Sequence, residues 1–298
     1  MSAARSLLTV VNKKPRLRRT KAALATLRNR LREIAEANRP LTLRNLFYCA
    51  VSKDLVEKTQ REYKAVMRAA LDLRRGGDMP WDWLVDSTRW MRKPNSYSSL
   101  HDLLDEQQRF YRRDLWQHQT TYVEVWCESE SLAGMIGSVT DDFDVPLMPG
   151  RGYSSHPFLY SAAQAIANQV HGGKQAFIYY VGDFDPSGLD IDRYTAARLR
   201  EYAGTDVSFH FERLAVTRAQ IQQLRLPTRP PKPSDTRSAG FRGGCVEAEA
   251  IPPDHMRGLL REAIERHIDP DVLEITRRIE QRERETLARM AARQRDRR

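Results

Sequence analysis

The segment YYVGDFDPSG, residues 179–188, ends a run of apolar residues with two aspartates and a Pro-Ser-Gly turn. The run begins at Ala176, and a strand this uniformly apolar is typical of a parallel sheet covered on both faces. Asp183 and Asp185 follow the strand, at the edge where ligands bind in open parallel sheets. In one interpretation they cap the next helix. In the other they hold a cation.

The segments on both sides of this strand predict an α/β fold. Strands are expected at 121–127, 144–149, 176–181 and 207–214, with helices at 131–139, 158–170 and 189–202. Strands that alternate with helices of this length predict a Rossmann-like, doubly wound parallel sheet. We assign this domain to residues 118–270 and expect a charged C-terminal helix or tail at 271–298.

The N-terminal part is predicted to be helical. Helices are expected at about 21–37, 43–51 and 57–75, the second capped by Thr42 and the third ended by the Gly76-Gly77 pair. The strand-prone segment 76–89 follows, so residues 20–117 are predicted to form a winged helix-turn-helix domain. The apolar stripe of the third helix is expected to consist of Tyr63, Met67, Ala70 and Leu71.

Charge points to a nucleic acid partner. The formal net charge is +10 and the pI is about 9.7, so we expect a polyanion to bind. Residues 1–19 are predicted to be a basic flexible arm. A face of the third helix carries the basic residues Arg61, Lys64, Arg68 and Arg75. We expect this face to contact double-stranded DNA, and the alternative is an ordinary solvated helix face.

The cysteines and the apolar segments exclude several classes of protein. Cys49, Cys127 and Cys245 are far apart and form no Cys-x-x-Cys pair, which argues against a disulfide framework and a zinc ribbon. The early apolar stretch LLTVV is too short for the core of a signal peptide or a membrane span. We therefore expect a cytoplasmic protein, associated with the nucleoid if prokaryotic, with no membrane partner.

A third acidic residue follows another predicted strand. Glu128 comes directly after residues 121–127, and if the two strands are neighbours it converges with Asp183 and Asp185. Three carboxylates held together require a cation, because like charges raise one another's pKa. Carboxylate oxygens suit Mg²⁺ or Mn²⁺, which in turn binds phosphate oxygens. Asp190 and Asp192 are expected to be solvated residues in the first turn of the next helix.

These motifs resemble the Toprim domain of type II topoisomerases, primases and overcoming-lysogenization-defect nucleases, in which a glutamate follows the first strand and Asp-x-Asp a later one. The chain is most similar to the A subunit of topoisomerase VI and its relative, the meiotic double-strand-break transesterase. GDFDPSG fits that family's Gly-Asp-x-Asp-Pro-x-Gly pattern. GRGYSS is similar to its Gly-Lys-Gly-Tyr-Pro element, with Arg151 in place of the lysine, which implies DNA contact by Arg151. CVEAEAI, residues 245–251, looks like its Glu-x-Glu-Ala-Leu segment. The resemblance covers roughly residues 20–270.

The resemblance extends to a tyrosine motif in the second predicted helix. RNLFY, residues 44–48, is similar to the family's Arg-Asp-Ile-Tyr/Phe-Tyr, although Asn45 replaces the acid and Leu46 the isoleucine. The alignment implies that Tyr48 is the nucleophile. Arg44 lies on the same helical face, where a guanidinium would favour the phenolate and hold a phosphate. The alternative is that Tyr48 packs in a helical core.

The resemblance implies a Mg²⁺-dependent enzyme that cleaves DNA by attack of Tyr48, leaving a 5′-phosphotyrosyl link. In the family, the tyrosine of one subunit works with the metal site of the other, which implies a homodimer. Strand passage would need a separate ATPase subunit. Two alternatives stay open: a Toprim nuclease that hydrolyses DNA with metal-activated water, and a non-catalytic winged-helix DNA-binding protein.

Overall fold

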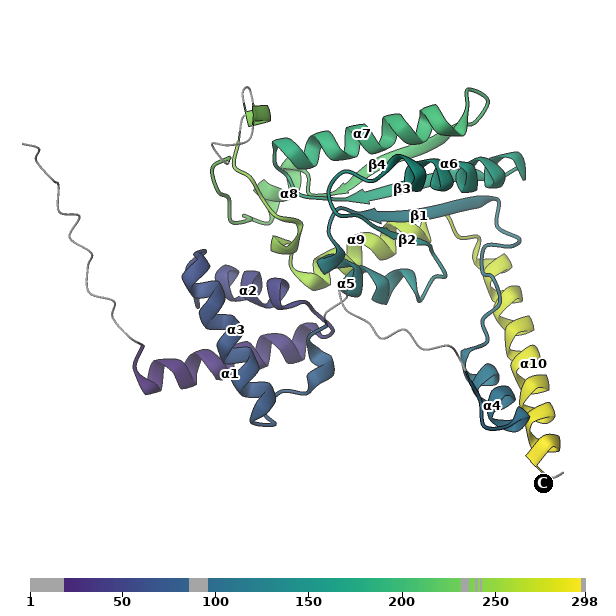
Figure 1. The fold of residues 1–298 in the computed structure, drawn as a ribbon, viewed down its shortest axis with the longest axis horizontal. Coiled ribbons are helices and arrows are strands. Elements are labelled where there is room, and N and C mark those ends of the chain that lie inside the picture. Colours follow the sequence, from purple (N-terminus) through teal and green to yellow (C-terminus); the bar gives the residue numbers. More distant parts are fainter. Residues whose placement is uncertain (1–18, 86–95, 232–235, 239–240, 242, 296–298) are drawn as a thin grey trace, which may run out of the picture.

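The computed structural model describes residues 19–85, 96–231, 236–238, 241 and 243–295. Within these ranges the protein is a mixed α/β structure with one four-stranded parallel sheet and ten α-helices. Figure 1 shows three parts: the sheet with its covering helices, a unit of three N-terminal helices, and an arm formed by α4 and α10. None of the helices in the described part of the chain is long and apolar enough to cross a membrane.

The sheet has the order β2-β1-β3-β4, and all its strands are parallel. The strands are β1 (Thr121–Cys127), β2 (Leu147–Pro149), β3 (Gln175–Val181) and β4 (Phe209–Ala215). The predicted parallel sheet is confirmed. Register pairs Thr121 with Gln175 and Cys127 with Val181, so β1 and β3 end side by side.

Helices cover both faces of the sheet (Figure 1). They are α5 (Glu130–Thr140), α6 (His156–His171), α7 (Pro186–Ala203), α8 (Arg218–Gln223) and α9 (Pro253–Glu265). Ile178 and Tyr180 of β3 belong to one buried cluster with α6 and α7, while Tyr179 and Val181 belong to the other. The apolar run is therefore buried on both faces, as the sequence predicts.

The three N-terminal helices form where the sequence predicts them. They are α1 (Lys21–Asn38), α2 (Leu43–Ser52) and α3 (Gln60–Arg75). The Thr42 hydroxyl caps α2 by accepting a hydrogen bond from the Asn45 backbone N–H. Helix α3 starts three residues later than predicted because Thr59 is extended and its hydroxyl accepts from the Glu62 N–H.

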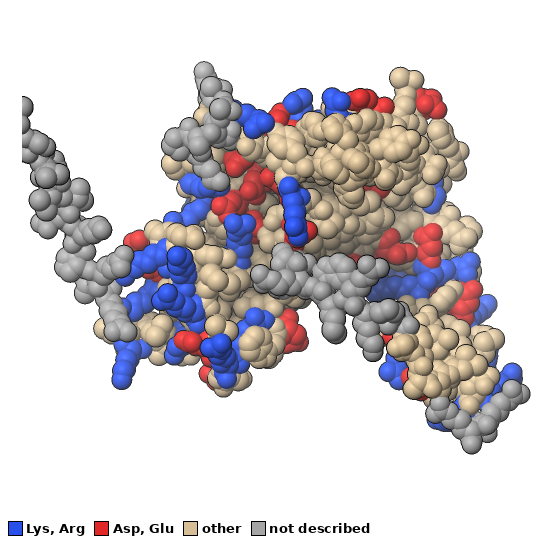
Figure 2. All heavy atoms as spheres, in the orientation of Figure 1, with Lys and Arg blue, Asp and Glu red and all other residues tan. Residues whose placement is uncertain are grey.

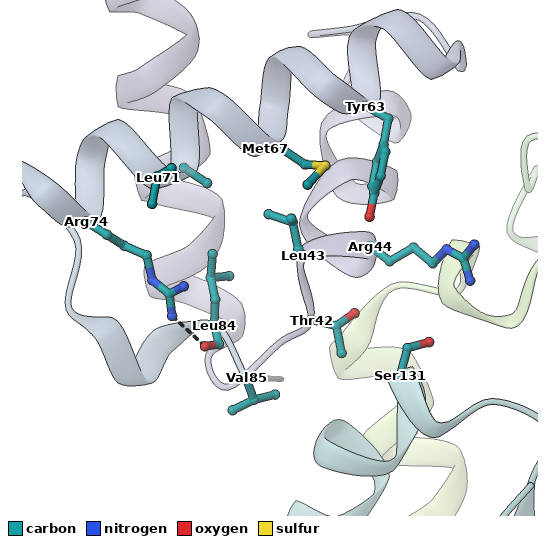
Figure 3. Close-up of a pocket in the computed structure, with 11 residues that line it drawn as sticks. Thr42, Leu43, Arg44, Tyr63, Met67, Leu71, Arg74, Leu84, Val85 and Ser131 are labelled. Carbon is teal, nitrogen blue, oxygen red and sulfur yellow. Dashed lines mark hydrogen bonds between the residues drawn. The ribbon is translucent and has the colours of Figure 1, made fainter. Parts of the chain in front are cut away.

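The predicted apolar stripe of α3 is mostly wrong. The buried residues are Val66, Ala69, Ala70 and Leu73, whereas Met67 and Leu71 are 40% and 38% exposed and Tyr63 is half-buried. Helix α1 packs on α3, and the ion pairs Arg28–Asp72 and Arg19–Glu62 hold that side toward α1. The buried face of α3 therefore differs from the predicted one. Met67 and Leu71 instead line a cavity of about 440 Å³ beside Leu43 and Leu84 (Figure 3).

The segment expected to form the wing is described only as far as Val85. It contains a short 3₁₀ helix, Trp81–Trp83, and an isolated parallel bridge between Leu41 and Leu84. Arg74 supports this turn by donating a hydrogen bond to the Leu84 carbonyl at 2.6 Å. Residues 86–89 lie outside the described residues, so the winged helix stays a prediction.

Helices α4 (Leu100–Phe110) and α10 (Pro270–Arg295) pair along their length and extend away from the sheet (Figure 1). The Tyr111 hydroxyl donates to Glu283 at 2.6 Å, and Arg113 forms an ion pair with Glu283 at 2.8 Å. Helix α4, which falls within the predicted 20–117 unit, thus packs on the charged C-terminal helix.

Candidate metal centre and tyrosine site

The carboxyl ends of β1 and β3 bring Glu128 and Asp183 into contact. The Glu128 N–H donates to the Val181 carbonyl at 2.9 Å, and the Asp183 N–H donates to Glu128 Oε2 at 2.9 Å. Gly188 allows this approach, since a Cβ there would lie 2.3 Å from the Asp183 carbonyl oxygen and 3.1 Å from Glu128 Oε2. The Glu128 carboxylate is therefore held against the backbone of the turn at Asp183.

The two aspartates of the turn have different backbone partners. Asp185 is the N-cap of α7, and its Oδ1 accepts from the Gly188 N–H at 2.8 Å. Asp183 Oδ1 accepts from the Ala248 N–H at 2.9 Å, in the segment that follows Cys245. The capping interpretation thus holds for Asp185, which nevertheless also lines the cavity described next.

A cavity of about 430 Å³ opens over this edge of the sheet. Its acidic lining residues are Glu128, Asp183, Asp185 and Glu247, and its basic ones are Arg44 and Arg229. Figure 2 shows acidic side chains gathered between the sheet and the N-terminal helices, with basic side chains around them. We call this space the acidic cavity. The structure brings the three predicted metal ligands together in it.

Burial and mutual repulsion destabilise the ionised carboxylates. Burial raises the pKa of Asp183 to about 8, and the charges of Glu249 and Glu128 add to that shift. The pKa of Glu128 is also raised, chiefly by burial and then by Asp185. A cation bound among these groups would favour their charged forms.

The donor set fits a hard cation in its chemistry. Glu128, Asp183 and Asp185 each place a carboxylate at the acidic cavity, and carboxylate oxygens are what Mg²⁺ and Mn²⁺ prefer. Each carboxylate has one oxygen bonded to a backbone N–H. In the arrangement seen, no group of three His, Cys, Asp or Glu residues within the described ranges is placed to hold a metal ion. Chelation would therefore require the side chains to turn inward.

Tyr48 lies beside a second cavity, of about 320 Å³, which we call the tyrosine cavity. Its side chain is only 4% exposed, and the Glu247 carboxylate lines the same cavity. The ammonium of Lys58 lies 5.1 Å from the ring centroid. Burial raises the pKa of Tyr48, Glu247 and Glu249 raise it further, and Arg44 opposes them. The phenol is therefore neutral as it stands, with a carboxylate ready to accept its proton.

The two cavities share Arg44, Arg229 and Glu247 in their linings. The Arg44 guanidinium forms ion pairs with Glu249 at 3.3 Å and with Glu247 at 3.7 Å. Figure 3 shows Arg44 extending away from Met67 and Leu71. Arg44 and Tyr48 thus share one side of α2, as predicted, and that side faces the acids of the same chain.

Asn45 has a structural role at the position where the resembling family has an acid. Its side chain completes the capping box with Thr42 and donates to the Glu249 backbone carbonyl at 3.2 Å. The residue is completely buried. An aspartate here would lose the donor and add a charge beside the Glu249 carboxylate.

Four residues were not predicted as site residues: Lys58, Arg229 and Glu247, which line the cavities, and Glu249, which pairs with Arg44. The two glutamates lie in the CVEAEAI segment, whose resemblance could have identified them. Arg229 comes from a Pro-rich loop, and its Nε is buried without a hydrogen-bond partner. Arg229 forms ion pairs with Glu247 at 3.4 Å and with Asp185 at 4.0 Å. No sequence motif surrounds Lys58 or Arg229.

The predicted DNA-contacting residues are all exposed. Arg61, Lys64, Arg68 and Arg75 lie on the solvent side of α3, opposite the face that packs on α1. Figure 2 shows basic side chains gathered over the α1–α3 unit. Arg151 lies in the loop after β2, at the same sheet edge as Glu128, and forms an ion pair with Glu130 at 2.6 Å.

The chain matches no protein-family model, no curated protein and no solved structure. A functional proposal therefore has to be argued from the chemistry of the acidic cavity and the tyrosine cavity. Residues from α2, from the sheet edge and from the segment 245–249 meet there.

Proposed function

We propose that this protein is a Mg²⁺-dependent DNA-cleaving transesterase, with a Toprim-like sheet domain and a winged-helix-like N-terminal unit. One observation carries the proposal: the acidic cavity and the tyrosine cavity adjoin and share Arg44, Arg229 and Glu247. A nucleophile, a phosphate-binding group and a set of metal ligands are thereby neighbours. These are the parts that phosphoryl transfer requires.

Glu128, Asp183 and Asp185 would hold the cation. When bound, Mg²⁺ neutralises charge on the phosphate and helps to orient it. The three carboxylates line one cavity, and burial destabilises the ionised forms of Glu128 and Asp183, so a cation would bind once these side chains turn inward. Keeping these carboxylates ionised costs free energy through desolvation and through mutual repulsion, and the bound ion would offset both costs.

Arg44 and Arg229 are the phosphate-binding candidates. Both guanidiniums reach the acidic cavity, and the Arg229 Nε is buried without a partner. Guanidinium groups bind phosphate oxygens through paired hydrogen bonds. Lys58, which lines the tyrosine cavity, would add a third positive charge near the same phosphate.

Tyr48 would attack the phosphorus atom. Its proton passes to the Glu247 carboxylate as the phenolic oxygen forms the new bond, because Glu247 lines the tyrosine cavity beside Tyr48. The bond from phosphorus to the 3′-oxygen breaks, and that oxygen takes up a proton from solvent. The product is a 5′-phosphotyrosyl link. Glu247 then returns its proton to solvent.

The partners follow from this chemistry. Double-stranded DNA would contact Arg61, Lys64, Arg68 and Arg75 of α3, with Arg151 near the sheet edge. A homodimer would place one such site on each strand of a duplex, and strand passage would need a separate ATPase subunit. Tyr48 lies beside the acids of its own chain, so we propose that each chain can supply both its own nucleophile and its own metal ligands.

The test is covalent trapping. The protein is incubated with supercoiled DNA and Mg²⁺, denatured rapidly, and analysed for protein-linked 5′ ends. We expect the adduct to disappear in Tyr48→Phe. Tyr63→Phe is the matched control, since Tyr63 lines the same cavity with its ring against Phe47, and it should retain the adduct.

A second candidate is a nuclease that uses metal-activated water. It is favoured by the low exposure of Tyr48 and by the raised pKa of its phenol, which burial causes first. Cleavage that survives Tyr48→Phe and leaves free 5′-phosphates would establish the nuclease and reject the transesterase. Asp183→Ala should abolish cleavage in both cases.

A further inference from the structure

A row of aromatic rings lies along the seam between α6 and α7, outside both cavities. In spatial order its members are Tyr153, Tyr194, His156, Tyr202 and Tyr160, which we call the aromatic row. Neighbouring ring centroids are 5.3, 6.3, 6.1 and 6.0 Å apart. Each step is an edge-to-face contact, so the rings form one continuous line.

The aromatic row is on the outside of the molecule. Helices α6 and α7 bury other residues against the sheet, including Leu159, Ile166 and Leu199. Tyr160 and Tyr153, at the two ends of the row, are 54% and 42% exposed. His156 is exposed as well, whereas Tyr194 and Tyr202 are half-buried against the cluster under the helices. Contacts between α6 and α7 explain why the middle rings touch. They do not explain why large rings are exposed at both ends.

Positive charges accompany the rings. The Arg237 guanidinium lies 5.5 Å from the centroid of Tyr153, and that of Arg198 lies 5.7 Å from Tyr194. Arg193 and Arg200 are exposed on α7. Arg193 and Arg237 pair with Asp190, and Arg198 pairs with Glu201, so four arginines stand beside two acids. In Figure 2 the surface over α6 and α7 is largely uncharged, with basic and acidic side chains along its upper edge. A polyanion that presents flat apolar groups is complementary to such a surface.

One end of the row lies near the acidic cavity. Tyr153 belongs to the loop that follows β2, whose Gly152 N–H bonds to the Glu128 carbonyl at 3.4 Å. The Tyr153 hydroxyl is hydrogen-bonded to Asp190, five residues after Asp185 on α7. Five helical residues span about 7.5 Å. A strand that leaves the acidic cavity would therefore meet Tyr153 first and Tyr160 last.

We propose that the aromatic row binds an unpaired DNA strand by stacking its bases. Aromatic side chains bind single strands regardless of sequence, because every base has a π-face. A duplex keeps its bases stacked inside, so it would gain little from these rings. Strand binding itself requires no cleavage. Only the purpose, to hold the end freed at the acidic cavity, rests on the proposed function.

The test is a comparison of single-stranded and duplex DNA binding by fluorescence anisotropy, in EDTA so that no cleavage occurs. A labelled 15-nucleotide strand and the duplex of the same sequence are the probes. We expect Tyr160→Ala and Tyr153→Ala each to weaken single-strand binding by about 5- to 100-fold and to leave duplex binding unchanged. Tyr160→Phe keeps the ring and should bind as wild type does. Phe110→Ala removes an exposed ring from α4, away from the row, and should have no effect.

Equal single-strand affinity of wild type and both alanine variants would overturn the proposal. So would an equal loss on the single strand and the duplex in variants whose melting curves match wild type. A change of oligomeric mass in sedimentation, with strand affinity intact, would identify a protein-binding surface instead. Normal strand binding by a protein that never cleaves DNA would reject the proposed function and keep the aromatic row.

Discussion

Two sets of charged side chains at the same edge of the sheet differ in how they are neutralised. Arg213 of β4 and Asp192 of α7 form an ion pair in which both side chains are less than 15% exposed. Arg213 also donates to the carbonyls of Gly182 at 2.9 Å and Gly188 at 2.8 Å. This pair closes the turn after β3 and leaves neither charge without a partner.

The acidic cavity lies on the other side of the same turn and lacks such balance. Glu128 and Asp183 have backbone N–H groups as partners, and their charges repel each other. The two guanidiniums that line the cavity, Arg44 and Arg229, are also shared with Glu247. Burial of charge is therefore common to both sets. Incomplete neutralisation is the reason we propose a cation site in the acidic cavity.

The largest expected effect is loss of the balanced pair. Arg213→Met leaves Asp192 buried without its partner and removes several carbonyl hydrogen bonds, so unfolding should become easier by about 3 to 5 kcal/mol. Urea unfolding followed by circular dichroism measures the change. Arg193→Met breaks the exposed pair with Asp190 on the same helix and should cost less than about 1 kcal/mol. Equal losses of stability in the two variants would show that the buried pair contributes no more than the exposed one, which contradicts the account.

The second prediction is that neutralising an aspartate changes the stability of the protein in opposite directions on the two sides of the turn. Asp183→Asn removes a repelled charge and keeps an oxygen for the Ala248 N–H, so the metal-free protein should gain about 1 to 3 kcal/mol of stability. Asp192→Asn leaves Arg213 buried without its charge partner and should lower stability. Thermal unfolding in EDTA compares them. A less stable Asp183→Asn variant would contradict the account.

The smallest expected effect is stabilisation by metal. Mn²⁺ at ten times its dissociation constant should add about 1.4 kcal/mol to the stability of the wild-type protein. Asp183→Asn should show little of this gain, whereas Arg193→Met should show all of it. Unfolding curves with and without Mn²⁺ measure both. A gain that persists in Asp183→Asn would locate the cation elsewhere.

Local patterns predicted the sheet and the acids at its edge. Strand periodicity places Glu128 and Asp183 after β1 and β3, and only the adjacency of those strands had to be assumed. The interpretation of Asp192 as a solvated first-turn residue is wrong. Helix α7 already begins at Pro186, and Asp192 pairs with Arg213 from a strand that the sequence does not place next to it.

Residues that depend on how distant segments meet could not be predicted. Lys58 and Arg229 carry no motif and reach the tyrosine cavity only through the packing of α2 against the segment 245–249. The buried face of α3 depends on where α1 lies, which periodicity alone does not state. In both cases tertiary contacts, and not local propensity, determine the position of the side chain.

The central claim is that Glu128, Asp183 and Asp185 bind one divalent cation beside Arg44 and Tyr48. Anomalous diffraction from crystals soaked in Mn²⁺ tests it most directly. The account predicts a peak in the acidic cavity coordinated by carboxylate oxygens of Glu128 and at least one of the two aspartates, and no such peak in Asp183→Asn crystals. A fully occupied Mn²⁺ peak on other acidic residues, with the acidic cavity empty, would contradict it.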